Sequence, residues 1–371
     1  MNKNNKYLYK SLLREDVMRE EAEKTAGLFE KIRQNPISPF AIFAVILVLI
    51  QSLSNVGLVS SAFVNAIGTT IIYCIIGLGF CLLLGYSALA SLGTAGFIGI
   101  GAYVAYYGLA AGKWGLPLSI TFIVAIVAAV IIGVVVGYIS LRIEGIYLAI
   151  VTLGIAQIIK EVLSAICDTI KLSGKDITLF GNDDWRMKTD DVFILIVAIM
   201  FLLMVITHNL MNSPTGRAML AMKNSTSAAQ AFGISLLKYR LLAFIISIVY
   251  ASIAGVLYML YVRYVSNSSS TLFALSTSLN ILGAVVIGGT KSIWGTIGGT
   301  FIIYGIDMMF LQDIKFFREN PTLITLFCGI LVVVVVMFYP GGLAQLMLEL
   351  KYKLKKLRIK MREAKYGKDL G

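Results

Sequence analysis

The chain has 371 residues, of which 58% are hydrophobic and only 14% are charged. Average soluble domains carry about 25% charged residues, so this composition excludes a soluble globular protein and indicates one that crosses a membrane several times. The formal charge of +12 does not indicate nucleic-acid binding. Its Lys and Arg residues lie mostly beside apolar runs, where they set topology and meet anionic lipid.

Both ends of the chain differ from its apolar middle. Residues 1–35 combine many charges with apolar residues at roughly helical spacing, which predicts an amphipathic segment on the cytoplasmic membrane surface. A membrane domain is expected over residues 36–345, and residues 346–371 form a basic tail. Excess Lys and Arg is typical of the cytoplasmic side, so both termini are predicted to be cytoplasmic.

Between the two ends, apolar runs long enough to span a bilayer follow one another along the chain. They cover residues of about 40–58, 62–85, 96–112, 116–140, 145–165, 191–208, 240–263, 272–290, 294–311 and 322–339. About ten crossings would return the chain to the side on which it started. The predicted fold class is therefore an all-α polytopic membrane protein with about ten transmembrane helices.

One segment, near residues 86–101, is too rich in small residues for a simple span. It permits two interpretations: close helix packing through small residues, or a broken or re-entrant segment beside a translocation path. The candidate path residues are Ser87, Ser91, Gly93, Thr94, Gly96, Gly99 and Gly101. A similar stretch at 283–299 suggests a divergent internal repeat.

A second segment, Met211–Tyr239, carries basic residues and no acidic one. Within it, STSAAQAFGI predicts a short helix that Ser225 and Thr226 cap at the start and that Gly233 ends. Because a few polar residues would be enough for a turn, we interpret this cytoplasmic loop, 209–240, as a docking element. The alternative is an ordinary solvated basic loop.

The sequence offers little chemistry of its own. The stretch GAVVIGGTKS lacks the spacing of a phosphate-binding loop and predicts a helix hairpin instead. With a single His and no paired Cys spacing, we expect no catalytic residues, no metal site and no cofactor. Acidic residues are missing from Val192 to Ile306, and only Glu144, Glu161 and Asp307 lie in or near spans with Lys160. A transporter of this kind would take its energy from a partner.

Several segments in chain order resemble the LivM-type permeases of branched-chain amino acid ABC importers. These are SLGTAGFIGIGAY (91–103), RIEGIYLAIVTLGIAQIIKEV (142–162), GRAMLAMKNSTSAAQAFGISLLKYRLLAF (216–244), VVIGGTKSIWGTIGG (285–299) and FYPGGL (338–343). The resemblance covers residues of about 60–345. It implies a transport subunit in a bacterial inner membrane, not an enzyme.

The resemblance also implies partners: a second, LivH-type permease subunit, two ATPase subunits, and an extracellular or periplasmic substrate-binding protein, with membrane lipid and no nucleic acid. The helix 224–234 is then similar to an ATPase-coupling helix. Its implied residues are Ser225, Thr226, Ala228, Ala229 and Gly233.

The chain departs from the family pattern at three positions. Thr226 and Gln157 replace commonly acidic residues, and Thr94 replaces a usual His. The substrate is therefore expected to be a branched-chain amino acid or a related small solute such as urea or an amide. The alternative function is an autonomous channel or gradient-driven carrier.

Overall fold

The computed structural model describes residues 37–110, 113–143, 145–167, 169–173, 177–178, 187–266, 273–311, 321–339, 341–347 and 349. Contact density divides the chain into two compact units, Met1–Leu47 and Val48–Gly371. The predicted amphipathic segment 1–35 and nearly all of the predicted basic tail lie outside the described residues. Within the first unit, the described residues are the beginning of one helix, α3.

Each predicted span corresponds to helical structure. The bounds are α3 Ser38–Asn55, α4 Ser61–Ser87, α5 Thr94–Leu109, α6 Leu118–Ser140, α7 Ile146–Ile166, α8 Thr189–Asn212, α11 Leu236–Val262, α12 Leu275–Gly288, α13 Ile293–Thr300 and α15 Pro321–Phe338. Among the described helices, α3, α4, α6, α7, α8 and α11 are long and apolar enough to cross a membrane. A helical, multi-pass membrane fold is thus confirmed, whereas the number of ten crossings stays a prediction.

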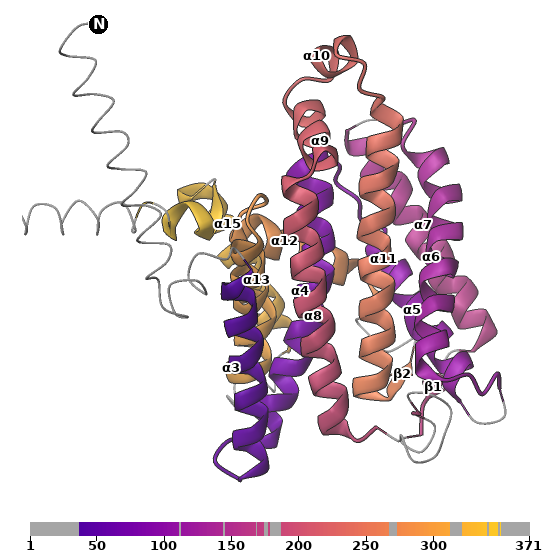
Figure 1. Cartoon of the computed structure of the whole chain (residues 1–371), viewed down its shortest axis with the longest axis vertical. Coiled ribbons are helices and arrows are strands. Elements are labelled where there is room, and N and C mark those ends of the chain that lie inside the picture. The colour runs from indigo at the N-terminus through magenta and orange to yellow at the C-terminus, as the bar shows by residue number, and fades with distance from the viewer. Residues whose placement is uncertain are drawn as a thin grey trace, which may run out of the picture. The chain divides into compact units, whose positions relative to one another are not determined.

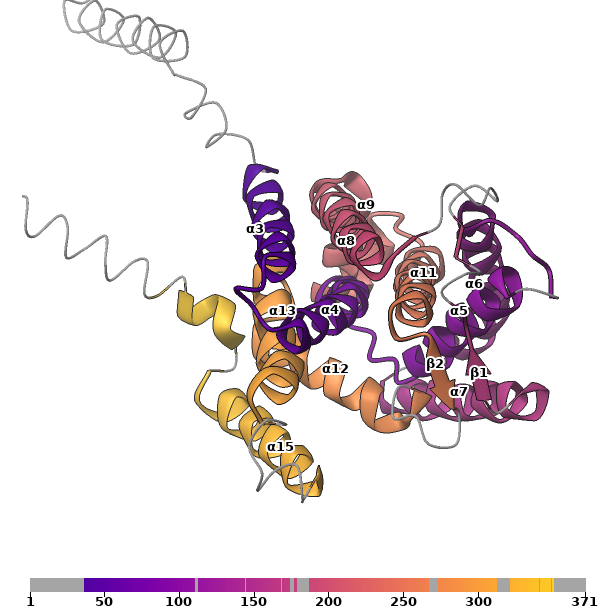
Figure 2. The ribbon, with the colours of Figure 1, turned by 90° about the horizontal axis from the view of Figure 1, so that it is seen from below.

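The helices differ in how far their neighbours cover them. In the most apolar window of each helix, 89% of α4 and 67% of α11 are buried, against 28% of α6 and 6% of α7. Helix α11 packs on α4, α5, α6 and α8, and Figure 2 shows it between α8 and α5. The core of the second unit is therefore built around α4 and α11, and α7 lies at its periphery.

Where α5 crosses α11, glycines let the two backbones meet. A Cβ on Gly101 would lie 2.0 Å from the carbonyl oxygen of Ser252, and one on Gly255 would lie 2.1 Å from that of Ile98. Contacts this close leave no room for any side chain. The small residues of α5 thus fix its distance from α11.

The helical backbone is interrupted between α4 and α5. Residues 88–93 are not helical, and Ala88 has a left-handed conformation with φ of 54°. The predicted break near 86–101 is therefore a six-residue linker, and residues 94–101 beyond it belong to a regular helix.

The corresponding stretch in the second half of the chain forms a tight hairpin. Helices α12 and α13 pack against each other so closely that a Cβ on Gly288 would lie 2.0 Å from the Gly295 carbonyl oxygen. The helix hairpin predicted for this stretch is thus confirmed. After α13 the backbone continues in two π-helical segments, η3 (Phe301–Gly305) and η4 (Asp307–Leu311).

The fold also contains a feature that an all-α prediction misses. Strand β1 (Thr169–Lys171) pairs antiparallel with β2 (Tyr264–Ser266), with Ile170 opposite Val265. Segments this short in polar loops carry no recognisable alternation, and their pairing joins residues almost a hundred positions apart in the chain, as for Thr169 and Ser266. Figure 1 shows the ladder at the end of α11 that is remote from α10 (Thr226–Ala231).

The loop predicted at 209–240 is mostly helical. Helix α8 continues to Asn212, and two short helices follow, α9 (Pro214–Asn224) and α10. In Figure 1 they stand together above α8 and α11. Only α10 was expected from the sequence. Helix α9 has a recognisable start, because Ser213 caps it and Pro214 occupies its first position.

Candidate functional site

Helix α10 is closed at both ends by local hydrogen bonds. The Ser225 hydroxyl accepts from the Ala228 N–H at 3.3 Å, and Thr226 is the first helical residue. At the other end, the N–H of Gly233 donates to the Gln230 carbonyl and that of Ile234 to the Ala229 carbonyl. This is a Schellman ending, and Gly233 supplies its left-handed residue with φ of +76°. The short helix predicted here is confirmed, with Ser225 as its N-terminal cap and Thr226 inside the helix instead of capping it.

The surface of α10 is unusually open. Of its six residues only Ala229 is buried, at 2% exposure, whereas Ala228 and Thr226 are exposed. Phe232, directly after the helix, is 86% exposed, the highest value among the large hydrophobic residues with an assigned exposure. An aromatic ring presented to solvent beside small residues is typical of a contact surface. In the sequence, Phe232 could have been identified as a candidate contact residue because it is an aromatic residue in a polar loop.

Helix α9 attaches α10 to the membrane helices. Its Gly216, Met219 and Met222 are buried, and α9 packs on α4, α8 and α11. Ser225 ends α9 and also caps α10, so no flexible linker separates the two helices. A force on α10 would therefore reach the membrane helices through α9.

Lys223 makes this attachment specific. Its ammonium group donates to the carbonyl oxygens of Leu84 at 3.1 Å and Gly85 at 2.9 Å, in the last turn of α4. The carbonyls at a helix C-terminus lack intrahelical partners and carry partial negative charge, which favours a cation. Desolvation by burial lowers the pKa of Lys223, and the nearby positive charge of Lys291 lowers it further.

The polar residues predicted beside a translocation path gather at the linker after α4. Ser87 and Ser91 are buried, and the Ser87 hydroxyl has no hydrogen-bond partner among the described residues. The Thr94 hydroxyl lies 3.2 Å from that of Ser278 in α12. The N–H of Leu92 donates to the Thr152 hydroxyl of α7 at 3.1 Å. The linker thus touches α7 and the second half of the chain together.

The predicted glycines lie in close helix contacts. A Cβ on Gly93 would lie 3.0 Å from the Thr152 carbonyl oxygen, and one on Gly96 would lie 3.1 Å from the Ala156 Cα. Gly99 faces Leu163 in the same way. These contacts support the packing interpretation for Gly96, Gly99 and Gly101. Their place on a translocation path stays a prediction.

The exposed side of α7 carries polar residues that were not predicted from the sequence to form a site. Gln157 and Glu161 are exposed, and the Gln157 amide donates to the Glu161 carboxylate at 2.8 Å. Tyr147, Ile150 and Gly154 continue this exposed stripe at alternating spacings of three and four residues. At a rise of about 1.5 Å per residue, Gln157 lies roughly 16 Å from the start of α7, near the middle of the helix.

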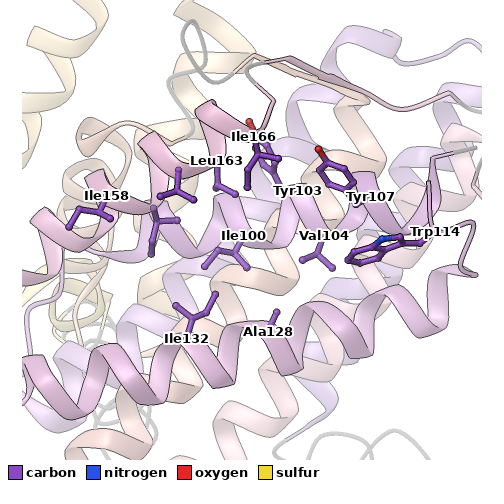
Figure 3. A pocket seen from close by; sticks show the side chains of 12 residues that line it. Ile100, Tyr103, Val104, Tyr107, Trp114, Ala128, Ile132, Ile158, Leu163 and Ile166 are labelled. Carbon is purple, nitrogen blue, oxygen red and sulfur yellow. The ribbon is translucent and has the colours of Figure 1, made fainter. Parts of the chain in front are cut away.

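A cavity of about 500 Å³ lies between α5, α6 and α7. Figure 3 shows Ile158 and Ile132 toward one end and Tyr107 with Trp114 at the other. The Tyr103 hydroxyl does not serve the cavity, because it donates to the Cys167 carbonyl at 2.5 Å. A wholly apolar wall offers nothing to a zwitterion, so this cavity is unsuited to a free amino acid.

Comparison with known proteins adds independent evidence. The family model described as branched-chain amino acid transport system / permease component matches residues 62–336. The LivM high-affinity branched-chain amino acid permease proteins of Salmonella typhimurium and Escherichia coli are each 30% identical over 321 residues, covering 77% of this chain and 71% of theirs. A probable LivM of Methanocaldococcus jannaschii is 28% identical over 239 residues, covering 60% of this chain and 67% of its own. No solved structure matches the chain.

Proposed function

This chain belongs to the family of permease components of branched-chain amino acid transport systems, and we propose that it is the transmembrane permease subunit of an ATP-binding-cassette importer. In this proposal it forms half of the translocation pathway for branched-chain amino acids or a related small solute. It is a multi-pass membrane protein, and we place it in a bacterial inner membrane with α10 and both termini in the cytoplasm.

The exposed end of α10 is the observation that carries the proposal. A rigid helix that leaves Phe232 86% exposed and is fixed through Lys223 to the end of α4 has the properties of a coupling element. We assign it to a groove on an ATPase subunit, with Ala228 and Phe232 in contact. Ser225, Ala229 and Gly233 hold its shape, and Thr226 lies on its exposed surface. Closure of the ATPases would then move α9 and α10 as a body and displace the end of α4.

A second permease subunit accounts for the outer face of α7. A carboxylate in a membrane span normally faces a protein interior or a water-filled cavity, because exposure to lipid is costly. The exposed Glu161 and Gln157 therefore support a partner on this face, with the translocation pathway between the two subunits. Gly154, which has no atom within 4 Å of a built Cβ, would let a partner helix approach closely.

The linker at 88–93 is the proposed moving part of the pathway. It follows the turn that Lys223 holds and carries the buried hydroxyl of Ser91. The buried hydroxyls of Ser87 and Thr94 flank the linker, and that of Thr94 lies beside Ser278 of α12. Irregular backbone at such a place is typical of transport proteins, where it lines a path. A displacement of α4 would reach these groups directly.

Reconstitution tests the function. Proteoliposomes holding this chain, its second permease and both ATPases should take up labelled leucine only with ATP and the binding protein present. The chain alone should neither hydrolyse ATP nor transport. Uptake of leucine by liposomes that contain only this chain would establish an autonomous channel or carrier in place of the importer.

A further inference from the structure

A small polar cavity lies at the end of the helices opposite α10. It has a volume of about 300 Å³ and is formed by the last turn of α3, the first turns of α4 and α8, and the last turn of α11. In the proposed orientation this end faces the outside of the cell. Unlike the apolar cavity beside α7, it is lined largely by side chains that can hydrogen-bond.

Its acceptors are fixed by a hydrogen bond between two of its residues. The Gln51 amide donates through Nε2 to the Asp190 carboxylate at 2.7 Å. Because an ionised carboxylate can only accept, the atom of the Gln51 amide that faces Asp190 must be the donor Nε2, and the other atom is Oε1. The Gln51 Oε1 is then left buried without a partner among the described residues, on a side chain that is only 7% exposed. A buried acceptor without a donor costs free energy unless a ligand supplies one.

The other side of the cavity offers donors. Ser61 begins α4, and the preceding Ser60 makes no side-chain bond to the first-turn N–H groups. The N–H groups of a first helical turn lack intrahelical partners and attract negative charge. By contrast, the N-terminus of α8 is capped by its own residues, because the Asp191 carboxylate accepts from the Lys188 N–H at 2.9 Å. The residues that line the cavity thus include two that carry acceptors, Asp190 and Gln51, and Ser61, at the helix start whose first-turn N–H groups have no side-chain cap.

We propose that this cavity is an outer binding site for an α-amino acid zwitterion. The ammonium group is held by the Asp190 carboxylate and the Gln51 Oε1, and the carboxylate lies at the first turn of α4. Val64 and Phe193 line the cavity as well and provide apolar surface for a side chain. The ammonium contact follows from the acceptors alone, whereas the choice of an amino acid rests on the proposed function.

Three matched probes test this chemistry on the full chain in lipid nanodiscs. Labelled L-leucine should bind, and 3-methylbutan-1-amine, which is leucine without its carboxylate, should compete with it more weakly. The acid 4-methylpentanoate, which lacks the ammonium group, should not compete. Failure of leucine to bind the folded wild-type chain, or equal competition by the acid and the amine, would overturn the proposal.

A pair of adjacent carboxylates provides the matched variants. Asp190→Asn removes the charge inside the cavity and should weaken leucine binding by about tenfold or more, as expected for a lost charged hydrogen bond. Asp191→Asn makes the same chemical change one residue away, at a group that caps α8, and should leave affinity within about twofold. Gln51→Met should weaken binding like Asp190→Asn. Equal affinities for Asp190→Asn and Asp191→Asn would contradict the site.

The outcome can be separated from that of the importer proposal. If the complete wild-type complex imports leucine but Asp190→Asn leaves the affinity of the chain for leucine unchanged, only the outer site is wrong. If the complex imports no branched-chain amino acid, the importer proposal fails, while competition among amines on the lone chain still tests the acceptors of Asp190 and Gln51.

Discussion

The ammonium nitrogen of Lys223 lies 2.9 Å from the carbonyl oxygen of Gly85. The two residues belong to different parts of the proposed machine, since Lys223 lies in the last turn of α9, the helix that carries α10, and Gly85 lies just before the linker at 88–93. On its other side Gly85 contacts the hairpin of the second half, because a Cβ there would lie 1.8 Å from the Thr290 carbonyl oxygen. This turn of α4 therefore joins the proposed ATPase contact to both halves of the permease.

Removing the Lys223 ammonium should uncouple the two ends of this connection. Lys223→Met keeps the aliphatic stem but loses both hydrogen bonds, which we expect to weaken this turn by about 1–3 kcal/mol, given that the side chain is only partly buried. Leucine uptake by the complex should fall about tenfold for an ATPase rate that stays near normal. Amide exchange at 86–93 should accelerate. Lys238→Met, at an exposed lysine of the same loop, is the control, and an uptake-to-ATP ratio unchanged by Lys223→Met would refute the connection.

The turn at Gly233 should tolerate asparagine but not valine. No atom lies within 4 Å of a built Cβ, so only the left-handed backbone opposes a side chain there. Asparagine adopts this conformation readily, whereas a β-branched residue costs about 1–3 kcal/mol. Gly233→Val should therefore reduce ATP-driven uptake several-fold at normal membrane levels, measured by immunoblot. Gly233→Asn should transport like the wild type, and loss of transport in both variants would mean that the backbone conformation is not what matters.

Phe232 should matter for the partner and not for the fold. Because its ring is 86% exposed, Phe232→Ser should leave the unfolding free energy of the lone chain within about 0.5 kcal/mol. Binding of the ATPase subunits to the permease in nanodiscs should weaken by about tenfold or more, as for an aromatic hot spot. Trp114→Ser alters another exposed aromatic ring at the far end of α5 and should not change ATPase binding. Wild-type ATPase affinity in Phe232→Ser would remove α10 from the interface.

The linker and the start of α5 should be sensitive to added volume. Ser91→Leu and Gly96→Leu overfill buried positions, at a cost of about 1–3 kcal/mol, and Gly96→Leu would push α7 outward. Both should block leucine uptake while the ATPases still assemble, as judged by co-purification. Gly298→Leu, at a helical glycine with no neighbour within 4 Å of its Cβ position, is the control for insertion. Normal uptake in Ser91→Leu and Gly96→Leu would limit this segment to packing.

The outer face of α7 should meet the second permease subunit. In a cysteine-free background, Gly154→Cys should cross-link to cysteines introduced into the partner, whereas Ile131→Cys, on the exposed side of α6, should not. Glu161→Leu should leave the lone chain at least as stable, because a charge leaves a lipid-facing position. The same variant should reduce pairing or uptake in the complex. Cross-linking from Ile131→Cys alone would place the partner elsewhere.

Local features of this fold were predictable because their physical causes lie close together in the chain. The apolar runs located the membrane helices to within a few residues, and Ser225 and Gly233 located α10, since capping depends on backbone groups within a turn. The same applies to the hairpin at 283–299. The strands β1 and β2 were missed, because they are short and pair with partners that are distant in sequence. Helix α9 was missed although Ser213 and Pro214 mark its start locally.

The candidate site was predictable only in part. The family resemblance pointed to residues 224–234 and to the small residues after α4, but it could not separate packing from pathway. For Gly101 the structure supports packing, because the Ser252 carbonyl occupies the place of a Cβ there. A pathway role for Ser87, whose buried hydroxyl has no partner among the described residues, stays a prediction. The exposure of Phe232 could not be predicted either, because burial depends on the whole set of neighbours.

The sequence by itself determined that this chain crosses a membrane several times and carries a capped helix in a basic loop, because hydropathy, charge and capping act over a few residues. That it resembles a permease came from motifs shared with a known family. Only the tertiary structure decided which groups from distant segments meet. Lys223 bonds to a carbonyl 138 residues away, and Gln51 bonds to an aspartate 139 residues away. The first pair arises because α4 packs on α9. The second arises because the last turns of α3 meet the first turn of α8. No periodicity along the chain records them, because the partners are brought together only when the whole set of helices packs.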